Sequence, residues 1–168
     1  MPPEMIIPLE EIDLNLCYAD KQGIREVIPQ RFEMLQLDRI VLMDVKRQLT
    51  IGIKEVRHDE FWVRGHMPGY PLLPGVVMCE AAAQLACFYI KKNHLMPNHL
   101  MGLAGLDKTR FRNIVRPGDR LLIVAKGLRI RPLRSIFDVQ GFVGNSMVFQ
   151  TEVHGVPIPG EELVIRDS

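Results

Sequence analysis

The stretch that decides the fold runs from Gly75 to His94 and reads GVVMCEAAAQLACFYIKKNH. Its alanines and leucine favour a helical backbone intrinsically. The apolar residues cover nearly every face of this helix instead of a single stripe, so other structure must wrap it. Lys91 and Lys92 stand at its carboxyl end, where positive charge complements the helix dipole. The sequence therefore predicts one central, enclosed helix.

The segments on either side of this helix have the pattern of β-strands. From Arg39 to Val63 the apolar residues tend to alternate, which predicts at least two strands with one buried face. After the helix, turn residues separate three apolar, β-branched segments: RLLIVAKGLRI (120–130), IFDVQGFV (136–143) and SMVFQTEV (146–153). The pattern predicts an α+β fold, in which a strongly curved antiparallel sheet wraps one long helix.

The length and composition indicate one domain. A chain of 168 residues that is 47% hydrophobic can bury one core. We expect residues 1–22, which contain three prolines, to form a peripheral extension with a short helix from about Leu9. The domain itself is expected over residues 23–156. The tail at 157–168 carries prolines and many charges, and we expect it to be partly mobile.

Charge and cysteine content exclude several classes of protein. The 21 basic and 20 acidic side chains give a net charge of +1, so the global basic field of a non-specific nucleic-acid binder is missing. An odd number of cysteines without framework spacing, and a start without a basic signal region, favour a cytoplasmic location. The longest apolar stretch, residues 76–90, is interrupted by Glu80 and Gln84 and is too short for a membrane span.

Glu80 and Gln84 are the two polar side chains of the enclosed helix, and their spacing places them on one face. Burying a carboxylate is costly unless it is paired or protonated. Taken alone, Glu80 has a structural interpretation, as a satisfied core carboxylate or an exposed residue of the first turns. It also has a catalytic one, and the preceding loop bears on the choice.

That loop reads GHMPGYPLLPG (65–75) and holds three prolines and three glycines in eleven residues. Such a segment is stiff, so His66 is held at a defined place, while Gly69 and Gly75 let the backbone approach a ligand closely. The remaining histidines lack this setting and are interpreted as surface or core residues: His58, His94, His99 and His154.

Loop and helix together resemble the signature of the β-hydroxyacyl-(acyl carrier protein) dehydratases, which have the hotdog fold. That signature has a histidine, a proline- and glycine-rich loop, a Pro-Gly helix start, an acid fourteen residues after the histidine and a glutamine one turn later. The residues that match are His66, Pro68, Gly69, Pro71, Pro74, Gly75, Glu80, Ala81 and Gln84. The segment LDKTRFRNIVRPGDRL (106–121) is also similar to this family, and the resemblance covers about residues 24–153. The chain departs from the family at Met67, Gln30 and Glu33, where phenylalanine, histidine and proline are usual.

The resemblance implies an enzyme that dehydrates 3-hydroxyacyl thioesters on acyl carrier protein in fatty acid biosynthesis, without a cofactor or a metal. His66 is expected to take the α-proton and Glu80 to protonate the leaving hydroxyl, unless His66 makes both transfers and Glu80 orients it. The free amides of Gly75 and Val76 predict an oxyanion site. Gln84 is expected to hydrogen-bond Glu80 or its water. The glutamate resembles the subgroup that dehydrates without isomerising.

The resemblance also implies partners. In the family, histidine and acid meet across a homodimer, and dimers often assemble into hexamers, although pairing within one chain is also geometrically open. Tyr70 is expected to contact substrate. An acidic carrier protein could dock on the basic residues that follow the helix, which otherwise form a solvated face: Lys108, Arg110, Arg112 and Arg116.

Two rival functions remain. A hotdog thioesterase would use the same helix start but deliver water to the carbonyl, and the spacing of His66 and Glu80 disfavours it. A non-catalytic acyl-binding protein would have lost its chemistry, whereas both residues are present here.

Overall fold

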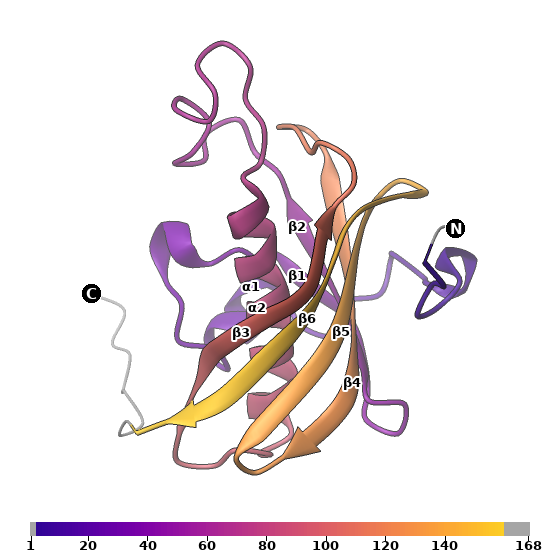
Figure 1. Ribbon diagram of the computed structural model, residues 1–168, viewed down its shortest axis with the longest axis vertical. Helices are drawn as coiled ribbons and strands as arrows, with labels where there is room; N and C mark the ends of the chain where they lie inside the picture. Colours follow the sequence, from indigo (N-terminus) through magenta and orange to yellow (C-terminus); the bar gives the residue numbers. More distant parts are fainter. Residues whose placement is uncertain (1–2, 160–168) are drawn as a thin grey trace.

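One long helix and a six-stranded sheet make up the core of the fold (Figure 1). The structure is a computed structural model, and it describes residues 3–159. In chain order, with η for a 3-10 helix, the elements are η1 (Leu9–Glu11), α1 (Lys21–Arg25), η2 (Phe32–Met34), β1 (Arg39–Asp44), β2 (Leu49–Glu55), α2 (Gly75–Lys92), β3 (Leu100–Phe111), β4 (Arg120–Arg131), β5 (Arg134–Val143) and β6 (Ser146–Ile158).

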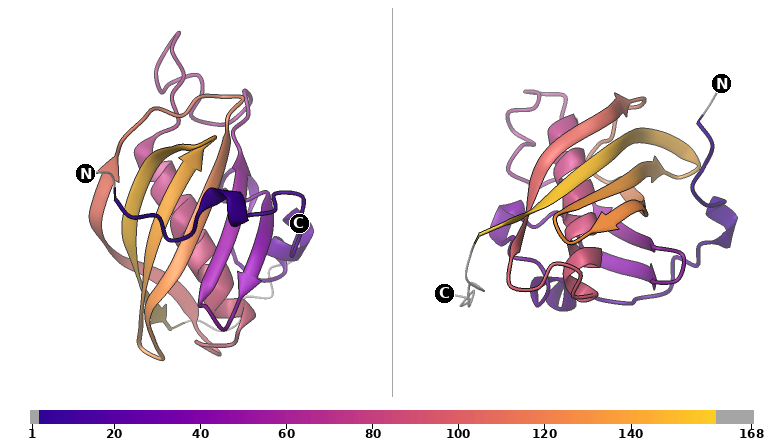
Figure 2. Two further views of the ribbon diagram at one scale, coloured as in Figure 1. Left: turned by 90° about the vertical axis from the view of Figure 1, so that its right-hand side faces the viewer. Right: turned by 60° about the horizontal axis from the view of Figure 1, so that its bottom comes forward.

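The sheet has the strand order β1-β2-β4-β5-β6-β3, and all neighbouring strands are antiparallel. It curves around α2, as the views in Figures 1 and 2 show. The prediction of an α+β hotdog fold is confirmed. Strand β3 lies at one edge and pairs with β6 alone, so its other side is open.

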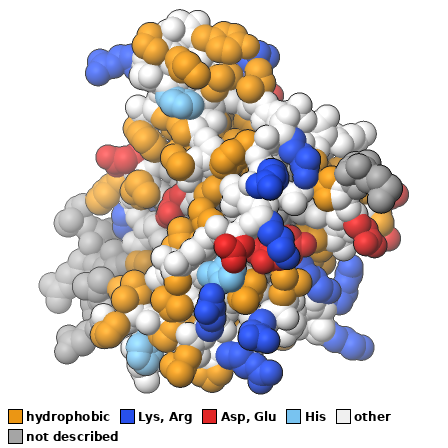
Figure 3. All heavy atoms as spheres, viewed as in Figure 1, with side chains coloured by type: hydrophobic (Ala, Val, Ile, Leu, Met, Phe, Trp, Pro, Cys, Tyr) orange, Lys and Arg blue, Asp and Glu red, His pale blue; other side chains and the backbone are white. Residues whose placement is uncertain are grey.

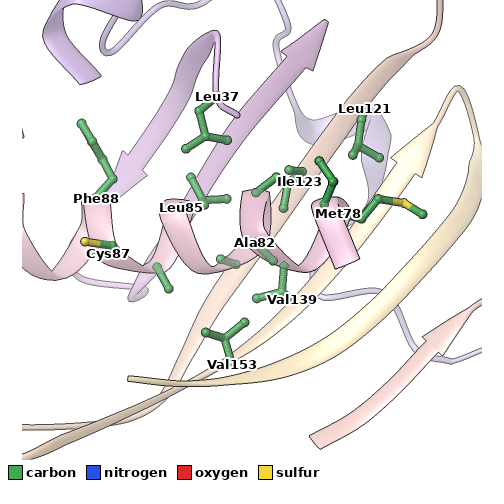
Figure 4. Close-up of a cluster of buried hydrophobic side chains, with 14 of the residues drawn as sticks. Leu37, Met78, Ala82, Leu85, Cys87, Phe88, Leu121, Ile123, Val139 and Val153 are labelled. Atoms are coloured by element: carbon green, nitrogen blue, oxygen red, sulfur yellow. The ribbon is translucent and has the colours of Figure 1, made fainter. Parts of the chain in front are cut away.

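The core lies between α2 and the concave face of the sheet. Ala81, Ala82 and Ala86 are fully buried, and such small side chains let the strands approach the helix closely. Figure 4 shows the helix residues among side chains from β4, β5, β6 and the segment before β1: Met78, Ala82, Leu85, Cys87 and Phe88 from α2, with Leu37, Leu121, Ile123, Val139 and Val153 around them. Each large apolar side chain buried in this way stabilises the fold by about 1.5–3 kcal/mol.

The N-terminal segment packs on the outer face of the sheet and crosses it (Figure 2). Ile7 is buried there among apolar residues of β1, β2, β4 and β5. The Ile6 N–H donates to Gln140 Oε1 at 3.0 Å, and Gln140 Nε2 donates to the Glu4 carbonyl at 2.9 Å. Helix α1 spans the boundary that the sequence placed between residues 22 and 23.

The structure confirms the predicted helix and the three long strands after it, and it differs in three places. The strand pattern read from Arg39 to Val63 ends at Glu55, and turns follow it. Strand β3 was not anticipated. In the predicted tail, Pro157 and Ile158 belong to β6, whereas residues 160–168 lie outside the described residues.

Candidate active site

The loop between β2 and α2, residues 56–74, rises above the amino-terminal end of the helix (Figure 1). Met67 and Tyr70 hydrogen-bond to each other in both directions, with N···O distances of 3.1 and 2.9 Å. Gly69, inside this turn, has a φ of +75°, which residues with a side chain rarely adopt. The loop therefore follows a defined path at the place where proline and glycine accumulate.

His66 is tied to this loop at both its backbone and its ring. The Leu72 N–H donates to the His66 carbonyl at 2.8 Å, and His66 Nδ1 lies 2.7 Å from the Leu72 carbonyl oxygen. Because a carbonyl oxygen only accepts, Nδ1 carries the proton in this contact. The Nε2 atom lies on the opposite side of the ring from this contact, and the side chain is exposed in the single chain.

Glu80 lies in the second turn of α2 and is held there by Gln84. Gln84 Nε2 donates to Glu80 Oε1 at 2.8 Å and to the Met34 carbonyl at 2.6 Å, while its Oε1 accepts the Gln36 N–H at 2.8 Å. Gln84 is fully buried, and the backbone N–H of Gln36 fixes which way its amide points. One oxygen of the half-buried Glu80 is thereby oriented, as the helical spacing had suggested.

The helix begins with free backbone donors beside an aromatic ring. Its amino-terminal cap is Pro74, which offers no side-chain hydrogen bond, and neither Gly75 N–H nor Val76 N–H has an acceptor among residues 3–159. A Cβ atom at Gly75 would lie 2.7 Å from Cζ of Phe111, so only glycine allows this ring to pack against the first turn. Val76 is 76% exposed.

The cysteines of α2 are poor candidates for a nucleophile. Burial raises the pKa of the Cys79 thiol, next to Glu80, to about 11, and that of Cys87 to about 12. A thiol with such a pKa stays protonated near neutral pH.

The contacts of one chain do not join the two catalytic candidates. His66 and Glu80 form no hydrogen bond or ion pair with each other within the described part of the chain. A surface pocket of about 810 Å³ lies at the opposite end of α2, with Lys91 and His94 in its wall, and it includes neither candidate.

Tyr70 and Arg116 were predicted for different roles, and the structure brings them together. The Arg116 guanidinium donates to the Tyr70 hydroxyl and lies 5.1 Å from the centre of its ring. Such cation–π contacts restrain both side chains. Both residues are exposed, and Tyr70 lies in the loop that carries His66.

The other three basic candidates lie in β3 or directly after its last residue, and each already has a hydrogen-bond partner. Lys108 donates to Glu152 at 2.5 Å, and Arg112 donates to Gln150 at 2.6 Å, both on β6. The hydrogen bond and charge of Glu152 raise the pKa of Lys108. Arg110 donates to the backbone carbonyl of the residue before it. All three side chains are exposed. The charge of Lys108 is offset by Glu152, whereas Arg110 and Arg112 bond to neutral groups and keep their positive charge.

One group of residues has donor atoms spaced as in a metal site. Donor atoms of Asp107, Glu152 and His154 lie within 4.8 Å of one another. However, Arg134 Nη2 donates to His154 Nδ1 at 2.8 Å, so the ring proton sits on Nε2, 3.1 Å from Asp107 Oδ2. Lys108 also donates a hydrogen bond to the Glu152 carboxylate, which is therefore already paired. These contacts explain the group as a structural network of charges.

Two contributors to this site escaped the sequence analysis. Gln36 acts through its backbone N–H, which has no sequence signal. Phe111 acts by packing against Gly75, and only knowledge of the β3 position would have revealed it.

Comparison with known proteins agrees with this architecture. Residues 28–152 match the FabA-like domain family. The 3-hydroxyacyl-[acyl-carrier-protein] dehydratase FabZ of Desulfotalea psychrophila is 34% identical over 137 residues, which cover 80% of this chain and 90% of that protein. The protein of the same name from Bacillus cereus is 38% identical over 112 residues, or 67% and 77% of the two chains.

Solved structures share the fold at lower identity. The dehydratase heterocomplex ApeI:P from Xenorhabdus doucetiae has a TM-score of 0.68 at 16% identity and covers 80% of this chain and 90% of that one. The PaaI protein of E. coli has a TM-score of 0.55 at 14% identity and covers 70% and 80%. These likenesses support the fold alone.

No helix within residues 3–159 is both long enough and apolar enough to cross a bilayer. The family match spans most of the chain, and it includes the loop and the helix that carry His66, Glu80 and Gln84. The relatives are similar over more than two thirds of their own length. The chain is therefore a member of the FabA-like family, to which its β-hydroxyacyl-(acyl carrier protein) dehydratase signature had pointed.

Proposed function

We propose that this chain converts (3R)-3-hydroxyacyl thioesters on acyl carrier protein to trans-2-enoyl thioesters in fatty acid biosynthesis. One observation carries the proposal: His66 Nδ1 is bound to the Leu72 carbonyl, which leaves Nε2 free to act as a base on a stiff loop. The names of the FabZ relatives, which are dehydratases of such substrates, support it.

The reaction is an elimination with two proton transfers. His66 Nε2 takes the α-proton, and the electron pair of that C–H bond becomes the carbon–carbon double bond. The β C–O bond breaks with its electrons on oxygen, and Glu80 protonates the departing hydroxide to give water. Transfer of the proton from the imidazolium to the carboxylate then restores the enzyme. No oxidant or reductant is consumed, so the reaction needs no redox cofactor.

Charge that develops on the thioester oxygen is stabilised by the helix start. The amides of Gly75 and Val76 are free donors at the positive end of the α2 dipole, which suits an oxyanion. Phe111 covers Gly75 and keeps water from one side of it. Gln84 keeps one oxygen of Glu80 occupied, so the other remains available to the substrate.

Spectroscopy with a 3-hydroxybutyryl thioester tests the reaction. Dehydration gives the ultraviolet absorbance of a conjugated enoyl thioester, whereas a thioesterase releases free thiol. If the thioester binds saturably but neither the enoyl absorbance nor free thiol appears, the protein is an acyl-binding protein. His66→Ala and Glu80→Gln should each lower turnover severely with the fold intact, and full turnover in either variant would refute the assignment.

We further propose that the active form is a homodimer with shared sites. The open edge of β3 presents unpaired backbone groups and the exposed side chains of Leu103, Leu106 and Phe111, and it lies beside the exposed Val76. Hydrophobic side chains also gather over the β2–α2 loop, at the top of the view in Figure 3. A second copy paired along β3 would cover these groups and bring His66 of one chain to Glu80 of the other.

Mixing two inactive variants tests the shared site. If His66→Ala and Glu80→Gln chains exchange, half of the dimers are mixed, and each has one intact site, so about a quarter of wild-type activity should return. No recovery despite exchange would mean that both residues act within one chain. Sedimentation of the wild-type protein would distinguish a dimer from a hexamer of three dimers.

Docking of the carrier protein on Lys108, Arg110, Arg112 and Arg116 is a further part of this proposal. If these charges steer an acidic carrier, KM for a carrier-bound substrate should rise with salt, because ions screen the attraction. KM for a short thioester without carrier should not change. Equal salt dependence for both substrates would place docking elsewhere. The odd, unpaired cysteines support a cytoplasmic location for these encounters.

A further inference from the structure

A buried ion pair lies at the base of the loop that carries His66. Lys54, near the end of β2, places its Nζ atom 2.8 Å from Oε2 of Glu60, and the two side chains are only 2% and 5% exposed. Removing two charges from water is costly, so such a pair persists only with good geometry and further hydrogen bonds.

Glu60 has those further bonds. Its Oε2 also accepts the indole N–H of Trp62 at 3.0 Å, and its Oε1 accepts the backbone N–H of Arg57 at 2.8 Å. Trp62 is itself buried in the core cluster around α2. One carboxylate thus fixes the start of the loop, the aromatic anchor of the loop and the last residues of β2 relative to one another.

The same tryptophan holds the backbone of His66. The Trp62 carbonyl accepts the His66 N–H at 2.8 Å and the Gly65 N–H at 3.2 Å. The His66 ring is then fixed by Leu72 through Nδ1. A continuous series of short contacts therefore runs from the ion pair, through both ends of Trp62, to the imidazole. No helix or strand holds residues 56–65, so these contacts determine where the histidine lies.

We infer that Lys54 and Glu60 are positioning residues for His66. They touch no substrate; they set the place of Trp62, and Trp62 sets the histidine backbone and so the direction of Nε2. This inference rests on the proposed role of His66 as the base. The competing explanation is that the pair only stabilises the fold.

The test neutralises the pair without leaving a lone buried charge. The double variant Lys54→Met/Glu60→Gln keeps the side-chain volumes, and exchanging a buried ion pair for neutral groups is often tolerated. The matched control is Arg120→Met/Glu55→Gln, which removes an ion pair of 2.7 Å that bridges the adjacent residue of β2 and is about half exposed. Both variants lose the same charges.

We expect kcat of the double variant to fall by about tenfold to a hundredfold with KM within about twofold, since small misplacements of a catalytic group have effects of this size. Nitrogen NMR of the His66 ring, assigned with His66→Asn, should show loss of the pure Nδ1–H tautomer. The control should match wild type in both. Unchanged kcat and tautomer, or the same losses in the control, would overturn the inference.

Trp62→Phe keeps an aromatic side chain but removes the indole N–H donor, and it provides a second test if the double variant does not fold. A several-fold lower kcat and a mixed tautomer support the inference, and wild-type values of both overturn it. The tautomer reports on positioning whether or not His66 is the base. Failure of the proposed function would instead appear as full turnover in His66→Ala.

Discussion

Replacing Gln84 by methionine should reduce both the stability of this protein and its turnover. The change keeps the length of the side chain but removes an amide that makes three hydrogen bonds in a fully buried position. The Gln36 N–H and the Met34 carbonyl lose their partner, and Glu80 loses its orienting donor. A thioether replaces none of these bonds effectively.

The loss of stability depends on how well water can reach each group that loses its hydrogen bond to Gln84. The Gln36 N–H is buried, and a buried donor without a partner costs about 1–3 kcal/mol. The Met34 carbonyl and Glu80 are only partly buried, so water compensates much of their loss. Together these losses should lower the unfolding free energy by about 3 kcal/mol. For a chain of this size, this corresponds to a Tm that is about 6–12 °C lower. Misorientation of Glu80 should lower kcat by about tenfold to a hundredfold.

Urea unfolding and steady-state kinetics at one fixed chain concentration measure both effects. The matched control is Glu80→Gln, whose amide oxygen can still accept from Gln84, so its stability should stay within about 0.5 kcal/mol while its activity is lost. Wild-type stability of Gln84→Met would refute the reasoning, because it would mean that the buried Gln36 N–H does not depend on this amide.

Three further predictions concern other parts of the molecule. Ile7→Ala should lower the unfolding free energy by about 2–4 kcal/mol in a urea titration, because this residue of the N-terminal segment is buried against the outer face of the sheet; no change would mean that the segment is not packed there in solution. Burial and the nearby charge of Glu152 raise the pKa of Asp138, so its ionised form destabilises the fold; Asp138→Asn should raise Tm at pH 8, and the gain should fade as pH falls toward 3.8. A thiol reagent at pH 8 should modify only the exposed Cys17 in the folded protein and all three cysteines in urea, because the other two are buried with raised pKa values.

The sequence predicted the parts of this fold whose burial pattern is local. The residues of α2 are apolar on nearly all faces because the sheet surrounds them, and that pattern is visible without knowledge of the neighbours. Strands β4 to β6 were equally clear between their turns. The proposed roles of His66 and Glu80 came from the family signature more than from any pattern, since a lone histidine and a half-buried glutamate each have structural explanations.

The same reasoning explains what was missed. Strand β3 is exposed along most of its length, and a register shift between Asp107 and Arg110 interrupts its alternation. Its sequence therefore shows no regular pattern of burial. The alternation of apolar and polar residues continues beyond Glu55, but these residues form turns and not a strand. The contacts of Glu60 and Trp62, and not a neighbouring strand, organise this part of the chain. A sequence pattern reports which residues are buried but not which residues they meet.

An enclosed helix can offer its backbone to a substrate only at its ends, and the two ends of α2 differ. At the carboxyl end the carbonyls of Tyr89, Ile90 and Lys91 already accept hydrogen bonds from the residues that follow the helix. The negative end of the helix dipole would in any case repel an oxyanion. The amino end has free amides under Phe111, and Phe111 belongs to the open edge strand. A partner that pairs with β3 would therefore fix the ring that covers Gly75. On this argument the proposed dimer interface and the cover of the proposed oxyanion site are physically linked, because the same strand provides both.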